Sequence, residues 1–329
     1  MSGLPRLLPW HREIFTRMMA LHQRDRLGHA WLFSGLQGMG KLTFARYLAQ
    51  SLLCESENPE TKPCCECKSC NLFNKGNHPD FQLVQPEKRL IKVEQIRDQL
   101  DFANQTSQRG GMKILVFKPA EAMNPNAANA LLKLLEEPPP GTLLVLISHQ
   151  PALLLATLRS RCQHLRCPAP TPALAASWLN EQGYAGNAEK ILQLANGAPL
   201  LALHLTESGV LAEHESISQC LSGLARGQTS ALQAAHECEK FSTMTCIENL
   251  MLAVKAALAQ QQAGLESADP DLQTVIQVLN RKAGAMALHA YYRKLLRARI
   301  ECLAPNNANQ LLILEDLFSG WSKLSQGST

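Results

Sequence analysis

A glycine-rich stretch near the N-terminus has the residue types and spacing of a phosphate-binding loop. Residues 35–43 read GLQGMGKLT and follow the apolar run at residues 30–33. In such a loop, glycines let backbone N–H groups curl around phosphates at the N-terminus of the next helix, and a lysine adds a positive charge. Gly35, Gly40 and Lys41 therefore form a candidate nucleotide site.

The same loop lacks the hydroxyl group that holds Mg²⁺ in a working site. Leu42 stands where serine or threonine is required, and Thr43 comes one residue later. One position along a helix turns a side chain by about 100°, so Thr43 cannot take over that role. The loop taken alone fits two interpretations equally well: a glycine-rich turn that binds nothing, and a weak nucleotide site.

A second loss affects the other side of the expected metal site. The apolar run at residues 113–117 predicts a strand beside the loop. In ATPases of this kind an acidic residue at the end of that strand completes the Mg²⁺ shell. Here the strand is followed by Lys118 and Pro119, and Glu121 comes too late to occupy the strand tip. The two losses together predict that the chain does not hydrolyse ATP by itself.

Five of the eleven cysteines lie between residues 54 and 70, and this clustering favours a metal site over disulfides. Cys64, Cys67 and Cys70 are spaced Cys-x2-Cys-x2-Cys, which brings pairs of sulfurs to one ion. We predict structural zinc on Cys54, Cys64, Cys67 and Cys70, with no open position for catalysis. The alternatives are Cys65 in place of Cys64, an iron–sulfur cluster, and free thiols.

These residues need a scaffold that brings strand ends together, and residues 28 to about 167 supply one. Apolar runs alternate with helical patterns there, which is typical of an α/β domain with a parallel sheet. A helix should begin at Asn124 and Pro125, with asparagine as N-cap, and end at residues 136–140, which read EEPPP. The expected strands are residues 30–34, 81–85, 113–117, 143–148 and 163–167.

A change in composition at residues 167–172, CPAPTP, predicts the end of this domain. Three prolines in five residues cannot continue a helix or a central strand. From residue 173 onward the patterns are helical. We therefore expect an α/β core at residues 1–168 with the cysteine module at about 54–70, a small helical domain at 169–208 and an all-α domain at 209–329.

Composition argues against a membrane-spanning or secreted protein. The chain has 329 residues, 46% of them hydrophobic and 18% charged, which allows two or three globular domains with buried cores. Its apolar stretches fall far short of the roughly 20 residues that span a bilayer. The first six residues have no signal-peptide pattern, so we expect a cytoplasmic protein. A net charge of +4 is too small to predict nucleic-acid binding.

Three motifs give the sequence a family resemblance. They are HAWLFSG at residues 29–35, NALLKLLEEPP at 129–139 and LRSRC at 158–162. In this order they resemble the bacterial clamp-loader AAA+ subunits. The resemblance implies an AAA+ core carrying the cysteine module, a helical lid, and a C-terminal collar through which subunits join into a pentamer. It also puts Leu200 where catalytic members carry an arginine that senses phosphate.

The resemblance moves the expected chemistry to Arg161. In clamp loaders the arginine of the Ser-Arg-Cys motif reaches the nucleotide of a neighbouring γ/τ subunit and stabilises charge on the transferred phosphoryl group. Motif position favours Arg161 over Arg159, and a surface arginine at a helix end is the alternative. The favoured function is a non-hydrolysing subunit that works with γ/τ and δ subunits to place a sliding clamp on primer–template DNA. The alternatives are an active γ/τ-type ATPase and a zinc-stabilised adaptor without enzymatic activity.

Overall fold

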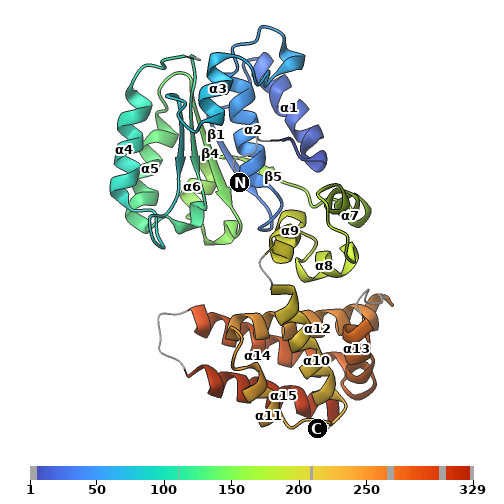
Figure 1. The fold of residues 1–329 in the computed structure, drawn as a ribbon. Coiled ribbons are helices and arrows are strands. Elements are labelled where there is room, and N and C mark those ends of the chain that lie inside the picture. The colour runs from blue at the N-terminus through green and yellow to red at the C-terminus, as the bar shows by residue number, and fades with distance from the viewer. Residues whose placement is uncertain (1–5, 110, 208–209, 265–269, 304–308, 327–329) are drawn as a thin grey trace. The chain divides into compact units, whose positions relative to one another are not determined.

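The computed structural model describes residues 6–109, 111–207, 210–264, 270–303 and 309–326 (Figure 1). The chain divides into two compact units. The first comprises residues 1–178 together with 197–201, and the second comprises residues 179–196 together with 202–329. The boundary expected between residues 208 and 209 lies outside the described residues.

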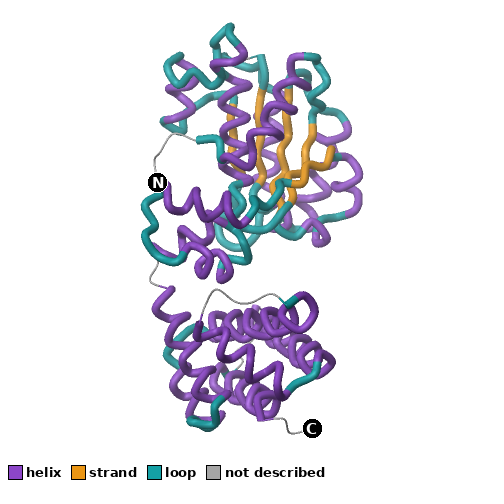
Figure 2. Tube along the Cα trace, turned by 90° about the vertical axis from the view of Figure 1, so that its right-hand side faces the viewer, coloured by secondary structure: helices purple, strands orange, loops and turns teal. Residues whose placement is uncertain are grey.

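A five-stranded parallel sheet forms the centre of the first unit, in the order β2-β3-β4-β1-β5 (Figure 2, orange). Ala30 of β1 lies opposite Leu144 of β4, and Trp31 lies opposite Gln163 of β5. The five expected strands are confirmed, with ends that agree to within one residue. Because the strands are parallel, the loops after them meet at one edge of the sheet. The strands are β1 (Ala30–Ser34), β2 (Phe81–Val84), β3 (Lys113–Phe117), β4 (Thr142–Ser148) and β5 (Gln163–Arg166).

Helices cover both faces of this sheet, because alternate strand residues point to opposite faces. Leu32 and Leu146 pack with apolar residues of α4, α5 and α6. Phe33 and Val145 pack instead with residues of α1, α2 and α3. Figure 1 shows these two groups of helices on either side of the strands. Their bounds are α1 (Arg12–Gln23), α2 (Lys41–Leu53), α3 (Lys68–Asn74), α4 (Val93–Asn104), α5 (Pro125–Glu136) and α6 (Ala156–Arg161).

The predicted limits of α5 are confirmed, and their cause is local. The Asn124 side chain accepts a hydrogen bond from Ala127 N at 2.8 Å, and Pro125 occupies the first turn. The helix ends at Glu136, one residue before the Glu137 cap and the three prolines that follow. This end of α5 lies against α6, so Glu136 and Arg161 are the last residues of two neighbouring helices.

The rest of the described chain is helical, as the sequence predicts, with no strand after β5 in the described ranges. In the second unit, Trp321 and Phe318 lie fully buried among apolar residues of the packed helices. No helix of the described residues is long and apolar enough to cross a membrane. The remaining helices are α7 (Pro172–Glu181), α8 (Ala188–Leu194), α9 (Pro199–Glu207), α10 (Val210–Ala225), α11 (Ala231–Cys238), α12 (Thr243–Ala263), α13 (Pro270–Lys282), α14 (Ala285–Leu303) and α15 (Gln310–Gln326).

Candidate functional site

The phosphate loop connects β1 to α2, and its lysine is turned inward. Gly38 and Gly40 both have a φ of 82°, a left-handed value that favours glycine. Lys41 begins α2 and is only 3% exposed. Its ammonium group donates hydrogen bonds to the carbonyl oxygens of Gly35 at 2.5 Å and Leu36 at 2.6 Å. Burial lowers the pKa of Lys41 to about 8. The lysine is thus bound to the carbonyl groups of its own loop.

Other segments of the first unit cover this loop. Leu200 N donates a hydrogen bond to Gly38 O at 3.1 Å. A Cβ atom added at Gly38 would lie only 2.6 Å from Leu201 Cβ, so this glycine is in close contact with the start of α9. From the N-terminal segment, Trp10 Nε1 donates to Met39 O at 3.0 Å. The chain itself therefore occupies both sides of the loop.

His11 closes the loop beside the first turn of α2. Its side chain is fully buried, and its ring centroid lies 5.1 Å from that of Phe44 and 5.9 Å from that of Trp10. Neither ring nitrogen has a hydrogen-bond partner among the described residues. Burial, with a smaller contribution from the charge of Lys41, lowers the pKa of His11 to about 4. An uncharged aromatic cluster therefore lies against the loop at neutral pH.

The strand ends beside the loop bring one cation, Lys118, and one carboxylate, Glu121, near Lys41. Burial lowers the pKa values of Lys41 and His149, and the nearby charge of Lys118 lowers both further. Glu121 lies close enough to raise the pKa values of Lys41 and His149, and its Oε1 accepts hydrogen bonds from His149 N at 2.8 Å and Gln150 N at 3.2 Å. Leu42 is partly buried in the apolar layer between the sheet and α1–α3. Neither Leu42 nor Lys118 can bind Mg²⁺.

The cysteine insertion brings together four of its five cysteines. The sulfurs of Cys54, Cys64, Cys67 and Cys70 all lie within 4.8 Å of one another and could hold a metal ion. The Cys64 and Cys70 sulfurs are 4.0 Å apart, close to the roughly 3.8 Å expected between ligands of tetrahedral Zn²⁺. Cys65 is not a member of the cluster; its thiol donates to Pro63 O at 3.6 Å. Between the two alternatives left by the sequence, the geometry favours Cys64.

Backbone N–H groups help to orient the sulfurs. Cys54 Sγ accepts from Cys64 N at 3.4 Å, and Cys67 Sγ accepts from Cys70 N at 3.3 Å. Backbone donors at Glu66 and Cys67 lower the pKa of Cys64 to about 6, whereas burial raises those of Cys54 and Cys70. Four thiolates this close repel one another, so a cation among them is needed to keep all four deprotonated.

The two histidines near these motifs make structural contacts. His29 Nε2 lies 3.0 Å from Leu135 O, which joins the start of β1 to the end of α5. His78 is buried, with Nε2 2.8 Å from Ser69 Oγ and Nδ1 accepting from Asp80 N at 3.1 Å. Since Ser69 lies between two cluster cysteines, His78 ties the insertion to the sheet.

Arg161 is the last residue of α6, and its side chain is 37% exposed. Its Nε and Nη2 both lie against Glu136 Oε1, at 2.9 Å and 2.6 Å. Its Nη1 donates to Thr157 O at 3.1 Å. Arg159 is less exposed, and its Nε is buried without a hydrogen-bond partner in the described part of the chain. Of the two arginines in the motif, Arg161 has the more exposed side chain.

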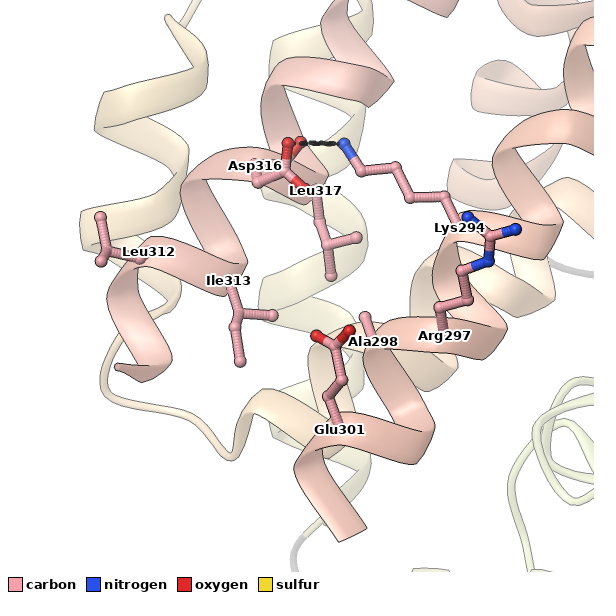
Figure 3. Close-up of a pocket in the computed structure, with 8 residues that line it drawn as sticks. All are labelled: Lys294, Arg297, Ala298, Glu301, Leu312, Ile313, Asp316 and Leu317. Carbon is pink, nitrogen blue, oxygen red and sulfur yellow. Dashed lines mark hydrogen bonds and ion pairs between the residues drawn. The ribbon is translucent and has the colours of Figure 1, made fainter. Parts of the chain in front are cut away.

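The second unit has a groove between α14 and α15, with a volume of about 300 Å³ (Figure 3). Lys294 spans it to Asp316, with Nζ 2.7 Å from Oδ1. Leu312 on the groove wall is 61% exposed, and Ile300 on α14 is 68% exposed. Apolar side chains are thus open to solvent beside a charged pair, as at many protein interfaces.

Sequence reasoning found the loop, the cysteines and Arg161, but it missed what touches them. The cover formed by His11 and Leu200 depends on tertiary packing of segments far apart in the chain. Glu136 lies within the motif at residues 129–139, and its position at the end of a predicted helix was visible. Its pairing with Arg161 was not, because it requires knowing that α5 and α6 lie side by side.

Comparisons with known proteins identify relatives along almost the whole chain. A family model described as DNA polymerase III, delta subunit, matches residues 10–171, and one described as its C terminal matches residues 209–323. The chain is 36% identical to DNA polymerase III subunit δ′ of Pseudomonas aeruginosa, covering 97% of this chain and 98% of that protein. It is 34% identical to the δ′ subunit of Yersinia pestis, covering 97% of each.

One solved structure shares less with this chain. A DNA polymerase III γ subunit-related protein from Thermotoga maritima is 16% identical, with a TM-score of 0.49, covering 94% of this chain and 99% of that one. The expected fold class is confirmed by the parallel sheet, the four-cysteine insertion and the two matching family models: an α/β AAA+ core followed by helical regions.

Proposed function

Because the chain belongs to the family of DNA polymerase III δ′ subunits, we propose that it serves a clamp loader without hydrolysing ATP at its own phosphate loop. The observation that carries this proposal is the inward-turned Lys41. Its ammonium group, which would contact phosphates in an active site, is bound to Gly35 O and Leu36 O. The loop is a degenerate relic in which Gly35, Gly40 and Lys41 no longer hold nucleotide.

Three further observations support the loss of hydrolysis. Leu42 packs into an apolar layer, and Lys118, directly after β3, brings a positive charge to the residue position where an ATPase carries its Mg²⁺ carboxylate. Leu200 and His11 lie over the loop glycines. A nucleotide could enter only if these segments moved away and Lys41 exchanged its partners.

The chemistry that this subunit contributes is that of Arg161, offered to the ATP site of a neighbouring γ/τ subunit. A guanidinium group is always charged and donates fork-like hydrogen bonds to phosphate oxygens, and such a finger is worth about 10³–10⁵ in rate in other systems. The exposure of Arg161 at the end of α6 supports this role, because a buried arginine could not reach another subunit. Loading of the sliding clamp on primer–template DNA is then an activity of the whole complex.

Zinc is the metal that best suits the cysteine cluster. Four thiolates in a tetrahedral arrangement fill the coordination shell, so Cys54, Cys64, Cys67 and Cys70 would hold the ion without leaving a position for water. The ion would stabilise the insertion between α2 and β2, where Cys54 ends one helix and Cys67 caps the next. Its role is structural.

The remaining chain serves assembly in a cytoplasmic pentamer. We divide the whole chain into the AAA+ core at residues 1–168, the lid at 169–208 and the collar at 209–329. The collar joins the γ/τ and δ subunits. The open apolar side chains beside the α14–α15 groove support a helix of a neighbouring collar as the occupant of this surface. Arg297 and Glu301 on the groove wall form no ion pair among the described residues, so a neighbouring helix that carries both acidic and basic residues would complement this surface.

The test is equilibrium ATP binding by the purified chain, with and without Mg²⁺, together with turnover by the isolated chain. We expect no saturable binding at millimolar ATP in either condition, and turnover at background. Mg²⁺-dependent turnover would support instead an active γ/τ-type ATPase. ATP binding without turnover would refute the closed loop but leave the role of Arg161 intact.

A further inference from the structure

Glu136 holds one edge of the Arg161 guanidinium group. Glu136 Oε1 lies 2.9 Å from Nε and 2.6 Å from Nη2 of Arg161. Both residues end their helices, and three prolines after Glu137 prevent α5 from extending. The backbone position of Glu136 is therefore fixed, and its half-exposed carboxylate is ordered by the contact with Arg161.

The hydrogen bonds that Arg161 makes leave some of its N–H donors free. A guanidinium group has five N–H donors, one on Nε and two on each Nη. Glu136 takes the Nε donor and one from Nη2, and Thr157 O takes one from Nη1 at 3.1 Å. One N–H on each Nη remains, so donors on both Nη atoms are available for phosphate oxygens.

We propose that Glu136 is a positioning residue for Arg161, which holds the guanidinium group in one orientation at the neighbouring ends of α5 and α6. The inference rests on the proposed finger role of Arg161. Arginine loses considerable side-chain freedom when it is fixed in one geometry. Glu136 and Thr157 restrict the Arg161 side chain before the neighbouring subunit binds, so less conformational entropy is lost in the transition state. Because Glu136 accepts from Nε and Nη2 only, it leaves one N–H on each Nη for phosphate once Thr157 O has taken its own.

The chain offers a matched control in Glu137, the next residue. It is also exposed, it has the same charge, and it forms no ion pair within the described residues. Glu136→Ala should reduce the Arg161-dependent part of ATP turnover in the reconstituted complex by about 3- to 10-fold, through kcat with KM for ATP unchanged. Glu137→Ala should leave turnover as it is. Glu136→Asp should recover part of the loss, because it restores the charge.

The decisive comparison repeats the change in an Arg161→Ala background. There Glu136→Ala should have no further effect, because Glu136 acts only through the arginine. In the isolated chain, the Arg161 Nε–H signal in NMR should exchange slowly with water, and this protection should be lost in Glu136→Ala while the rest of the spectrum is unchanged. That readout needs no partner subunit.

The outcomes separate this inference from the function on which it rests. If Arg161→Ala leaves turnover unchanged, the finger role itself is wrong. If Arg161→Ala lowers turnover but Glu136→Ala does not, the finger stands and positioning by Glu136 is refuted. Equal losses from Glu136→Ala with and without Arg161, or a rise in turnover, would also overturn it, since both require another route of action.

Discussion

Replacing His11 by phenylalanine should remove a defined pH dependence of stability. The folded protein lowers the pKa of His11 from 6.5 to about 4, chiefly by burial. As the pH falls, the unfolded chain binds a proton at His11 before the folded chain does. The contribution of His11 to the free energy of unfolding is therefore fully present above pH 6.5 and is lost as the pH drops toward 4. Relative to its value above pH 6.5, the free energy of unfolding falls by about 1.4 kcal/mol at pH 5.5 and by about 3 kcal/mol at pH 4 because of His11 alone.

Phenylalanine suits this position because neither ring nitrogen of His11 has a partner among the described residues, and the ring packs with Phe44 and Trp10. Urea unfolding of both proteins at pH 8 and pH 5.5 isolates the effect of His11. Other histidines with lowered pKa values, such as His149, cancel in the difference between the two proteins. From pH 8 to pH 5.5 the free energy of unfolding should fall by about 1.4 kcal/mol less in the variant than in the wild type. Equal pH dependence in the two proteins would refute the neutral, buried ring beside Lys41.

The metal site and the groove give two further predictions. Cys64→Ala should reduce zinc well below one ion per chain by elemental analysis and lower the thermal stability of the first unit, whereas Cys65→Ala should retain the metal; zinc loss in both variants would contradict the ligand assignment. Ile300→Asp and Leu312→Asp should weaken assembly of the complex at least about tenfold, because a charge would enter a desolvated interface. Leu232→Asp on α11, 57% exposed, is the matched control for assembly by analytical ultracentrifugation, and an equal loss from all three changes would refute a specific surface.

Local sequence was sufficient for the elements that position the site. Strand β4 is buried along its whole length, and its continuous apolar run was visible in the sequence. Asn124 and Pro125 marked the start of α5 because capping is a short-range interaction. Cys-x2-Cys spacing identified the cysteine cluster for the same reason. Two ligands of one ion lie on a single turn, which is also a short-range feature.

Contacts between distant segments could not be read in this way. Leu200 and Gly38 are far apart in the chain, and only the folded first unit joins them. Whether Lys41 binds phosphate or its own loop depends on side-chain direction, which spacing does not encode. The choice between Cys64 and Cys65 depends on local backbone geometry that the spacing leaves open. Cys65 has a φ of 61°, and with this left-handed conformation its thiol bonds to Pro63 O outside the cluster.

The central claim is that this subunit serves ATP hydrolysis through Arg161 and not through Lys41. The most direct test compares ATP turnover by reconstituted complexes in which only this chain carries Arg161→Ala or Lys41→Met. We predict that Arg161→Ala lowers the turnover of the complex while Lys41→Met leaves it unchanged. Loss of turnover with Lys41→Met, and none with Arg161→Ala, would contradict the account.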